Sequence, residues 1–331
     1  MLTVKRPSGA RATSGARATS GARASAGARA LEARNQAVRH RGIKSMRVGV
    51  PFVAVHLACL AVIAVGWSPV AVGTCVALYV AREFGITVFY HRNLSHRAFR
   101  LPRVAQAAGA VLGASAAQRG PLWWVAHHRR HHRFTDLPGD PHSPVVDGMW
   151  RAHLLWLFDA ANQPTAREEV PDLARFPELR ILDRFHHVVP AATALACFGL
   201  GTLLARAGVD TSGLQLLVWG FCISTVALYH STFAVNSIAH HFGKRRFATG
   251  DESRNNWLVS ALTLGEGWHN NHHRCPAVAR QGFGRLELDP GWWVIRGMSR
   301  LGIASAVRLP DERVLAEGGI PPGQRARLLR R

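Results

Sequence analysis

Four stretches of the chain carry almost no charge, and each is long enough to cross a bilayer. They cover residues 49–67, 70–90, 188–205 and 213–235. At about 1.5 Å per residue, a helix of roughly 20 residues spans a hydrocarbon core of about 30 Å. Short turns join the first stretch to the second and the third to the fourth. The pattern therefore predicts an all-α integral membrane protein with four transmembrane helices arranged as two hairpins.

The segments outside these stretches are polar and differ from one another in amino-acid composition. Residues 1–46 repeat a six-residue unit that begins at Ser8 as SGARAT, and they contain ten Lys and Arg residues with one acid, Glu32. Because this segment has almost no large apolar side chain, we expect a disordered tail there, with Met46 as an alternative start. Residues 47–298 form the predicted membrane domain, whose polar parts pack as a helical cap on the four helices. Residues 299–331 are expected to form a basic tail.

The charge balance points to topology rather than to a nucleic-acid partner. The chain has 41 Lys and Arg against 20 Asp and Glu, and 48% of it is hydrophobic. The two hairpin turns contain one basic residue, Arg206, and the segments outside the hairpins contain nearly all the others. The positive-inside rule then predicts a multi-pass protein with both termini and the cap in the cytoplasm. Nucleic-acid binding would require a folded basic surface with stacking aromatics, whereas much of this charge lies in the repeat.

Nine of the 18 histidines fall in four short motifs near the predicted helix ends, and one of these motifs begins with Asn236. The motifs are HRNLSH at 91–96, HRRHH at 128–132, NSIAH at 236–240 and HNNHH at 269–273. Positions i, i+3 and i+4 share one face of a helix, so HRRHH and HNNHH should each present three imidazoles in one direction. His91 and His96 are five residues apart and converge only if the helix ends or bends there.

Imidazole nitrogen suits iron, zinc, copper and nickel, and nine imidazoles exceed what one ion can bind. Two ions are the simplest arrangement, and an uncharged nitrogen shell leaves them positive and suited to oxygen activation. Hydrolytic zinc fits less well, because no HExxH occurs and catalytic zinc needs only three protein ligands. A carboxylate di-iron bundle needs two ExxH motifs, and this chain has one, from Glu266 to His269.

At these motifs the sequence resembles the membrane fatty-acid desaturases, specifically the acyl-CoA Δ9 (stearoyl-CoA) branch, over about residues 50–295. The matching text is FYHRNLSHRAF (89–99), WVAHHRRHHRFTD (124–136), GDPHSP (139–144), NSIAH (236–240) and GEGWHNNHH (265–273). The resemblance implies a di-iron centre that removes two hydrogens from neighbouring methylenes of a long acyl chain with O2 and electrons. The metal ligands it implies are His91, His96, His128, His131, His132, His240, His269, His272 and His273, with Asn236 acting through water.

The resemblance also implies an acyl tunnel. Gln118 and Trp124 stand where the family bends the acyl chain. Thr232 and Phe233 stand where the family usually has Thr-Trp, so Phe233 is a departure. An acyl-CoA substrate is the first expectation.

Two further positions bear on the acyl carrier. Members that bind CoA have an Arg-Asp pair where this chain has Ala126 and His127. Because of this departure, an acyl lipid and an acyl carrier protein remain alternatives to CoA as the carrier of the acyl group.

Four polar residues close to the motifs are candidates to orient the ligand imidazoles by accepting their N–H groups. They are Asp136, Asp140, His142 and Glu266. Electrons are expected from a separate ferredoxin-, rubredoxin- or cytochrome b5-like protein, or from a reductase. A related lipid hydroxylase remains an alternative, which product analysis separates. A non-catalytic membrane metal-binding protein should instead place its ligands near the bilayer midplane.

Overall fold

The computed structural model describes residues 46–329, with side chains from residue 49 onward. The N-terminal tail expected from the sequence lies, apart from Met46, outside the described residues. Within residues 46–329 every regular element is a helix, and strand-like pairing is limited to three isolated bridges. The prediction of an all-helical protein is therefore confirmed for the part of the chain that the structure describes.

Three described helices are long and apolar enough to cross a membrane: Pro69–Ser95, Val188–Arg206 and Gly213–His240. The first is α4 (Pro69–Phe84) continued by the π-helix η2 (Gly85–Ser95), and the second is α11 (Val188–Arg206). The third runs through α12 (Gly213–Leu216), the π-helix η6 (Leu217–Ile223), α13 (Ser224–Ser237) and η7 (Ile238–His240).

The remaining apolar stretch forms a shorter apolar helix, Gly49–Val65. It consists of α2 (Met46–Ala58), η1 (Cys59–Ala61) and α3 (Val62–Val65). Three of the four expected spans thus have the required length and composition. A fourth crossing by this shorter helix stays a prediction.

The two hairpin turns begin their second helices in the same way and are bonded to each other. Ser68 caps α4 by accepting from the Ala71 amide, and Ser212 caps α12 by accepting from the Gln215 amide. The Ser68 hydroxyl also donates to Gln215 Oε1 at 2.7 Å, and Gln215 Nε2 donates to the Val65 carbonyl at 2.9 Å. The two turns are therefore joined by hydrogen bonds that satisfy polar groups at the end of an apolar bundle.

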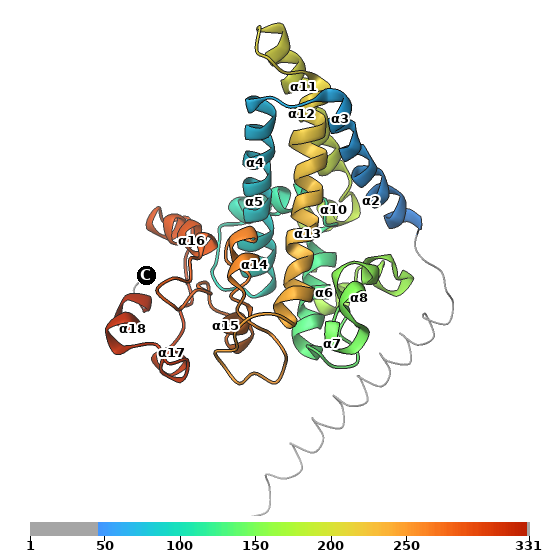
Figure 1. Cartoon of the computed structure of the whole chain (residues 1–331). Coiled ribbons are helices and arrows are strands. Elements are labelled where there is room, and N and C mark those ends of the chain that lie inside the picture. Colours follow the sequence, from blue (N-terminus) through green and yellow to red (C-terminus); the bar gives the residue numbers. More distant parts are fainter. Residues whose placement is uncertain (1–45, 330–331) are drawn as a thin grey trace, which may run out of the picture. The chain divides into compact units, whose positions relative to one another are not determined.

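Helices α4 and α13 run side by side (Figure 1). Arg82 of α4 is buried between them and donates to the hydroxyls of Ser224 and Thr225, the latter at 2.8 Å. A buried arginine in an apolar helix is expensive unless its donors are satisfied, and here hydroxyl and carbonyl oxygens satisfy them. This contact fixes α13 against α4, and both helices continue into the segments that carry histidines.

The cap is built from helices that follow each hairpin. The longer ones are α5 (Arg103–Ser115), α6 (Pro121–Phe134), α10 (Pro177–Arg184), α14 (Trp257–Leu262), α15 (His269–Arg274), α16 (Pro290–Arg300), α17 (Glu312–Glu317) and α18 (Pro322–Leu328). Short ones are α7 (Pro144–Asp147), α8 (Met149–His153), η3 (Leu155–Phe158), η4 (Ala160–Asn162), η5 (Arg167–Glu169) and α9 (Pro171–Ala174).

Clusters of buried hydrophobic side chains hold the cap together. Tyr90, Leu122 and Leu228 belong to a core that joins η2, α6 and α13. Residues 299–329, set apart in the sequence as a basic tail, include α17 and α18, whose Leu315 and Leu328 pack with Phe283 in a second cluster. The elements that carry the histidine motifs are therefore anchored by buried apolar contacts.

Candidate metal centre

The structure brings the nine histidines of the motifs into two separate groups. The first group is His91, His96, His128, His132 and His272, and the second is His131, His240, His269 and His273. Within each group one ring nitrogen from every residue lies within 4.8 Å of the others. Five and four imidazoles therefore converge on two points, as two ions would require.

The π-helix η2 is what aligns the two histidines of the first motif. In a π-helix each amide bonds the carbonyl five residues back, so residues i and i+5 lie on one face. The His96 amide bonds the His91 carbonyl at 3.1 Å, and the two Nε2 atoms also lie 3.1 Å apart. His96 Nε2 is 2.6 Å from His128 Nε2. The expected convergence is achieved by a local widening of the helix.

Helices α6 and α15 each contribute to both groups. In α6, His128 and His132 belong to the first group and His131 to the second. In α15 the assignment is reversed, because His269 and His273 belong to the second group and His272 to the first. Residues i and i+4 align better than i and i+3 on a helix of 3.6 residues per turn. The three imidazoles of each motif are therefore shared between two points instead of meeting at one.

Nε2 contacts across the two helices complete each group. His272 Nε2 lies 3.1 Å from His91 Nε2 and 2.9 Å from His132 Nε2. In the second group, His269 Nε2 lies 3.0 Å from His240 Nε2 and 3.0 Å from His273 Nε2.

Three of the four residues expected to orient imidazoles accept from them. His131 Nδ1 lies 3.0 Å from both oxygens of Asp140. His240 Nδ1 lies 3.0 Å from Asp136 Oδ2, and a carboxylate oxygen of Glu266 contacts His91 Nδ1.

The fourth, His142, has a different position. Its ring lies against that of His131, with centroids 4.6 Å apart, and its Nδ1 is 3.8 Å from Asp140 Oδ1. It also lines the cavity described below. It therefore packs beside a motif histidine and does not accept from one.

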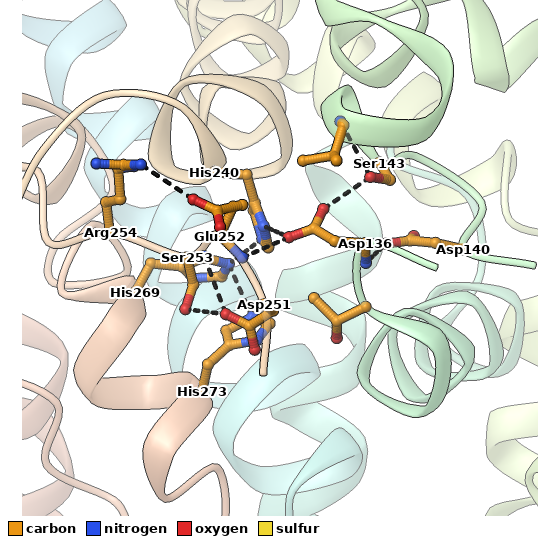
Figure 2. A network of polar contacts seen from close by, with 12 residues as sticks. Asp136, Asp140, Ser143, His240, Asp251, Glu252, Ser253, Arg254, His269 and His273 are labelled. Carbon is orange, nitrogen blue, oxygen red and sulfur yellow. Dashed lines mark hydrogen bonds and ion pairs between the residues drawn. The ribbon is translucent and has the colours of Figure 1, made fainter. Parts of the chain in front are cut away.

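Two further residues face the Nδ1 atoms of motif histidines, and no motif in the sequence pointed to them. Asp251 Oδ2 lies 3.1 Å from His273 Nδ1 (Figure 2), and Gln281 Nε2 lies 3.2 Å from His272 Nδ1. The buried Gln281 Oε1 has no hydrogen-bond partner, and a 180° flip of the side-chain amide would exchange it with Nε2 and make it the acceptor for a hydrogen on His272 Nδ1. Both lie in loops outside the motifs, where only the folded chain brings them to the histidines.

Asp136 joins the second group to the loop that carries Asp251. Its carboxylate accepts from the Ser143 hydroxyl at 2.7 Å and from the Glu252 amide at 2.8 Å, besides His240 (Figure 2). Burial alone would raise the pKa of the Asp136 carboxyl, but these donors hold it below its ordinary value. In the same way the charge and hydrogen bond of His131 outweigh burial and lower the pKa of Asp140. Both carboxylates are therefore ionised at neutral pH.

The electrostatics of the histidines fit a cation at each group. Burial, and then repulsion between neighbouring rings, lowers the pKa of six of the nine well below the ordinary value: His96, His128, His132, His269, His272 and His273. For His131 the carboxylate of Asp140 outweighs burial and raises the pKa. The Nδ1 atoms of four of the histidines face carboxylate oxygens: His91, His131, His240 and His273. Rings that carry their hydrogen on Nδ1 direct bare Nε2 lone pairs at one another. Lone pairs about 3 Å apart repel unless a cation lies between them, and the donor set therefore fits bound metal ions.

A cavity of about 740 Å³ adjoins the first group and is lined by His128, Asn236 and all four residues expected to bind substrate. Those four are Gln118, Trp124, Thr232 and Phe233. Gln118 Nε2 donates to Thr232 Oγ1 at 2.8 Å, and Trp124 Nε1 donates to Gln118 Oε1 at 3.2 Å. The structure thus brings three polar side chains from different elements to one place on the wall of the cavity.

Comparison with known proteins agrees with this arrangement. The fatty acid desaturase family model matches residues 50–289. The palmitoyl-monogalactosyldiacylglycerol delta-7 desaturase of Arabidopsis thaliana is 40% identical over 277 residues, which cover 81% of this chain and 71% of that protein. An acyl-CoA 5-desaturase of Anemone leveillei is 40% identical over 264 residues, covering 78% and 77%. Delta-9 acyl-lipid desaturase 1 of Arabidopsis thaliana is 39% identical over 264 residues, covering 78% and 81%. A family match over most of the chain, with relatives near 40% identity, shows that this chain belongs to the fatty acid desaturase family.

Proposed function

We propose that this chain is an O2-dependent desaturase that inserts a cis double bond at Δ9 of a long saturated acyl chain. Two irons are held by the nine histidines, with Asn236 contributing through water. The observation that carries the proposal is the pair of all-histidine groups beside a large cavity with a mostly apolar wall. Relatives named as lipid and acyl-CoA desaturases support it.

The chemistry explains why this family needs a metal. Methylene C–H bonds have no acidity that a general base can use, and bound irons with O2 supply the oxidising power to break them. The acyl chain loses two hydrogens, and O2 with two electrons and two protons ends as two water molecules. The protein's task is to hold the irons, position the chain and keep bulk water away.

Residues of this chain supply that positioning. Asp136, Asp140 and Glu266 hold the ring orientation of three histidines, which fixes where the Nε2 atoms point. The hydrogen-bonded side chains of Gln118 and Thr232 line the cavity, and we expect the acyl chain to bend beside them. A bent chain beside the first group would present one pair of methylenes, which supports a single double-bond position.

The acyl carrier is proposed as a CoA thioester, with a glycerolipid as the second candidate. One observation favours the second. Ala126 is buried in the apolar core, and the His127 ring packs against Trp123 with ring centroids 4.2 Å apart. Burial lowers the pKa of His127 to about 3, so this pair offers no cation where CoA-binding members have an arginine. The relatives' names include carriers of both kinds.

The membrane arrangement is part of the same proposal. Gly49–Val65 would form the fourth crossing, with both termini and the histidine groups on the cytoplasmic side. A separate ferredoxin-, rubredoxin- or cytochrome b5-like protein, or a reductase, would deliver the electrons to that face.

Expression in a host that lacks unsaturated fatty acids tests the function. The wild-type chain should produce cis-unsaturated fatty acids with the double bond at Δ9, measured by gas chromatography and mass spectrometry of derivatised products. The His131→Ala variant should insert into membranes at the same level without forming product. Hydroxylated fatty acids in place of unsaturated ones would identify the chain as a hydroxylase, and equal product from the variant would contradict the metal assignment.

A further inference from the structure

Three histidines outside the motifs form a chain of ring-to-ring contacts beside the cavity of about 740 Å³, here called the acyl cavity. His56 Nε2 lies 3.2 Å from His230 Nε2, and His230 Nδ1 lies 3.0 Å from His153 Nε2. Because His230 faces its two neighbours with different ring nitrogens, the three rings do not converge on one point as the metal groups do. The chain joins three elements that are separate in the sequence: α2, α8 and α13.

The hydrogen positions of this histidine chain follow from its two ends. His56 Nδ1 lies 2.7 Å from the Phe52 carbonyl, which can only accept, so this nitrogen carries the hydrogen of the ring. The Nε2 of a neutral His56 then accepts from His230, and His230 Nδ1 in turn accepts from His153 Nε2. At the other end the Ser237 hydroxyl lies 2.9 Å from His153 Nδ1 and can donate to it. Every ring nitrogen thus has a partner while all three rings are neutral.

The histidine chain lies partly within the apolar helices and contains no carboxylate. Among the described residues, no Asp or Glu bonds or pairs with any of the three rings. His56 belongs to the apolar helix Gly49–Val65, and His230 belongs to the span Gly213–His240. Polar side chains are costly in such helices unless they are paired, and hydrogen bonds between them hold neighbouring helices together. The chain therefore ties the shorter apolar helix to α13 and to the cap helix α8.

The histidine chain packs against a column of stacked aromatic rings. Phe52, Tyr229 and Phe233 all line the acyl cavity. The ring centroids of Phe52 and Tyr229 lie 5.5 Å apart and those of Tyr229 and Phe233 lie 5.7 Å apart, with nearly parallel planes in both pairs. The His56 ring packs against Phe52 with centroids 4.2 Å apart, and the His153 ring packs edge-on against Phe233 with centroids 5.8 Å apart. Both ends of this aromatic column are therefore supported by the histidine chain.

The aromatic column is continuous with the polar part of the cavity wall. Phe233 follows Thr232, whose hydroxyl accepts from Gln118 Nε2 at 2.8 Å. Asn236 lies within one turn of Phe233 on α13, and both line the cavity together with His128 of the first histidine group. A shift of this wall would move the acyl chain relative to the first group. A displacement of about 1 Å in the reacting geometry can lower a rate by roughly 100-fold.

We propose that His56, His153 and His230 are positioning residues, which hold the aromatic column in place and so select the pair of methylenes that faces the first histidine group. The proposal rests on the proposed function and extends it to residues that set the double-bond position. None of the three belongs to either metal group or lines the cavity. They act through the rings of Phe52 and Phe233, which they contact.

The test compares two substitutions of the central ring. His230→Phe keeps a ring of similar volume and removes both hydrogen bonds, whereas His230→Gln keeps a donor and an acceptor. Each variant is expressed in a host that lacks unsaturated fatty acids, and its membranes are supplied with a saturated acyl substrate. His230→Phe should form double bonds at more than one position and lower kcat by roughly 10- to 100-fold, with a much smaller change in KM. His230→Gln should restore the single position of the wild type.

His241→Phe is the matched control, because His241 is exposed and outside the histidine chain. A His230→Phe variant that matches this control in double-bond position and kcat contradicts the proposal. A His230→Gln variant as impaired as His230→Phe also contradicts it, because the hydrogen bonds would then have no role. Where His230→Phe does not insert into membranes, His153→Phe and His153→Gln replace the pair, since His153 lies outside the apolar helices.

Two measurements without turnover separate the histidine chain from the metal and from the proposed function. The iron content of purified His230→Phe should equal that of the wild type, and a lower content would contradict a role in positioning alone. A wild-type chain that forms no unsaturated product contradicts the proposed function instead. Hydrogen–deuterium exchange then tests the chain: the α2 amides should exchange roughly fivefold faster in His230→Phe than in the wild type or His230→Gln. Equal exchange in all three would contradict the proposal.

Discussion

The Nε2 atoms of His91 and His96 lie 3.1 Å apart although the residues are five positions apart, because the helix that carries them is a π-helix there. An α-helix would place them about 140° apart around its axis and direct them to different neighbours. The widened turn is also closely packed against a neighbouring helix. η2 lies against α5, where Gly113 leaves room for the Tyr90 ring. The first histidine group therefore depends on a local helix form that tertiary packing supports.

Replacement of His96 with Ala should lower the iron content of the purified protein by roughly half, because the first group loses a central ligand and the second stays intact. Iron is measured by inductively coupled plasma mass spectrometry. His241→Ala is the control, since His241 is exposed and belongs to neither group. An unchanged iron content in the His96 variant would contradict the assignment of five histidines to one ion.

The Asp251→Asn substitution should weaken metal binding by roughly 10- to 100-fold, because His273 loses the carboxylate that accepts its Nδ1 hydrogen. Competition with a chelator of known affinity measures the change. Glu252→Gln provides the control, because the Glu252 side chain pairs with Arg245 and Arg254 at the surface. Equal affinities of the two variants would show that Asp251 has no role in orienting His273.

The iron-free protein should lose stability as the pH falls below about 6.5, the ordinary pKa of histidine. Burial lowers the pKa of His128, His132, His272 and His273 in the folded chain, so the unfolded chain binds more protons between the lowered values and 6.5. Each such ring removes up to about 1.4 kcal/mol of stability per pH unit across that window. Thermal unfolding in detergent from about pH 5 to about pH 8, a range that contains the upper part of this window, measures the slope. Iron-loaded protein should show a smaller slope, and equal slopes would contradict the prediction.

Gly113→Ala should destabilise the protein by about 1–3 kcal/mol, because the added Cβ would lie 2.3 Å from a ring carbon of Tyr90. The ring cannot give way easily, since Tyr90 is fully buried in the core that joins η2 to α6. Gly73→Ala is the matched control, because nothing lies within 4 Å of its added Cβ in α4. Thermal unfolding compares the two variants, and iron content shows whether η2 has moved. A Gly113 variant as stable as the Gly73 variant would rule out close packing at this contact.

Hydrophobic patterning predicted much of the fold. The apolar stretches beginning at 70, 188 and 213 correspond to helices that start within one residue of the expected positions. Two of them run further at their far ends, to Ser95 and His240, because the chain stays helical where polar motif residues become buried by the cap. The third ends at Arg206, one residue past the expected position. Composition detects the part of a helix that faces lipid. It does not detect the part that continues into protein.

The residues of the candidate site also fall into those that the sequence predicted and those that only the fold revealed. Motif spacing singled out the nine histidines that meet in the structure, and their proximity to acids pointed to Asp136, Asp140 and Glu266. Asp251 and Gln281 could not be found from spacing, because their loops fold back on α15 from outside the motifs.

Local sequence thus decided which side chains bear the chemistry, since residue type and helical period are properties of short segments. The fold decided which of the two histidine groups each side chain belongs to. His131 and His132 are neighbours in the chain but belong to different groups, because α6 and α15 each contribute histidines to both groups. Grouping depends on where two helices meet, and that position is set by buried contacts between residues far apart in the sequence.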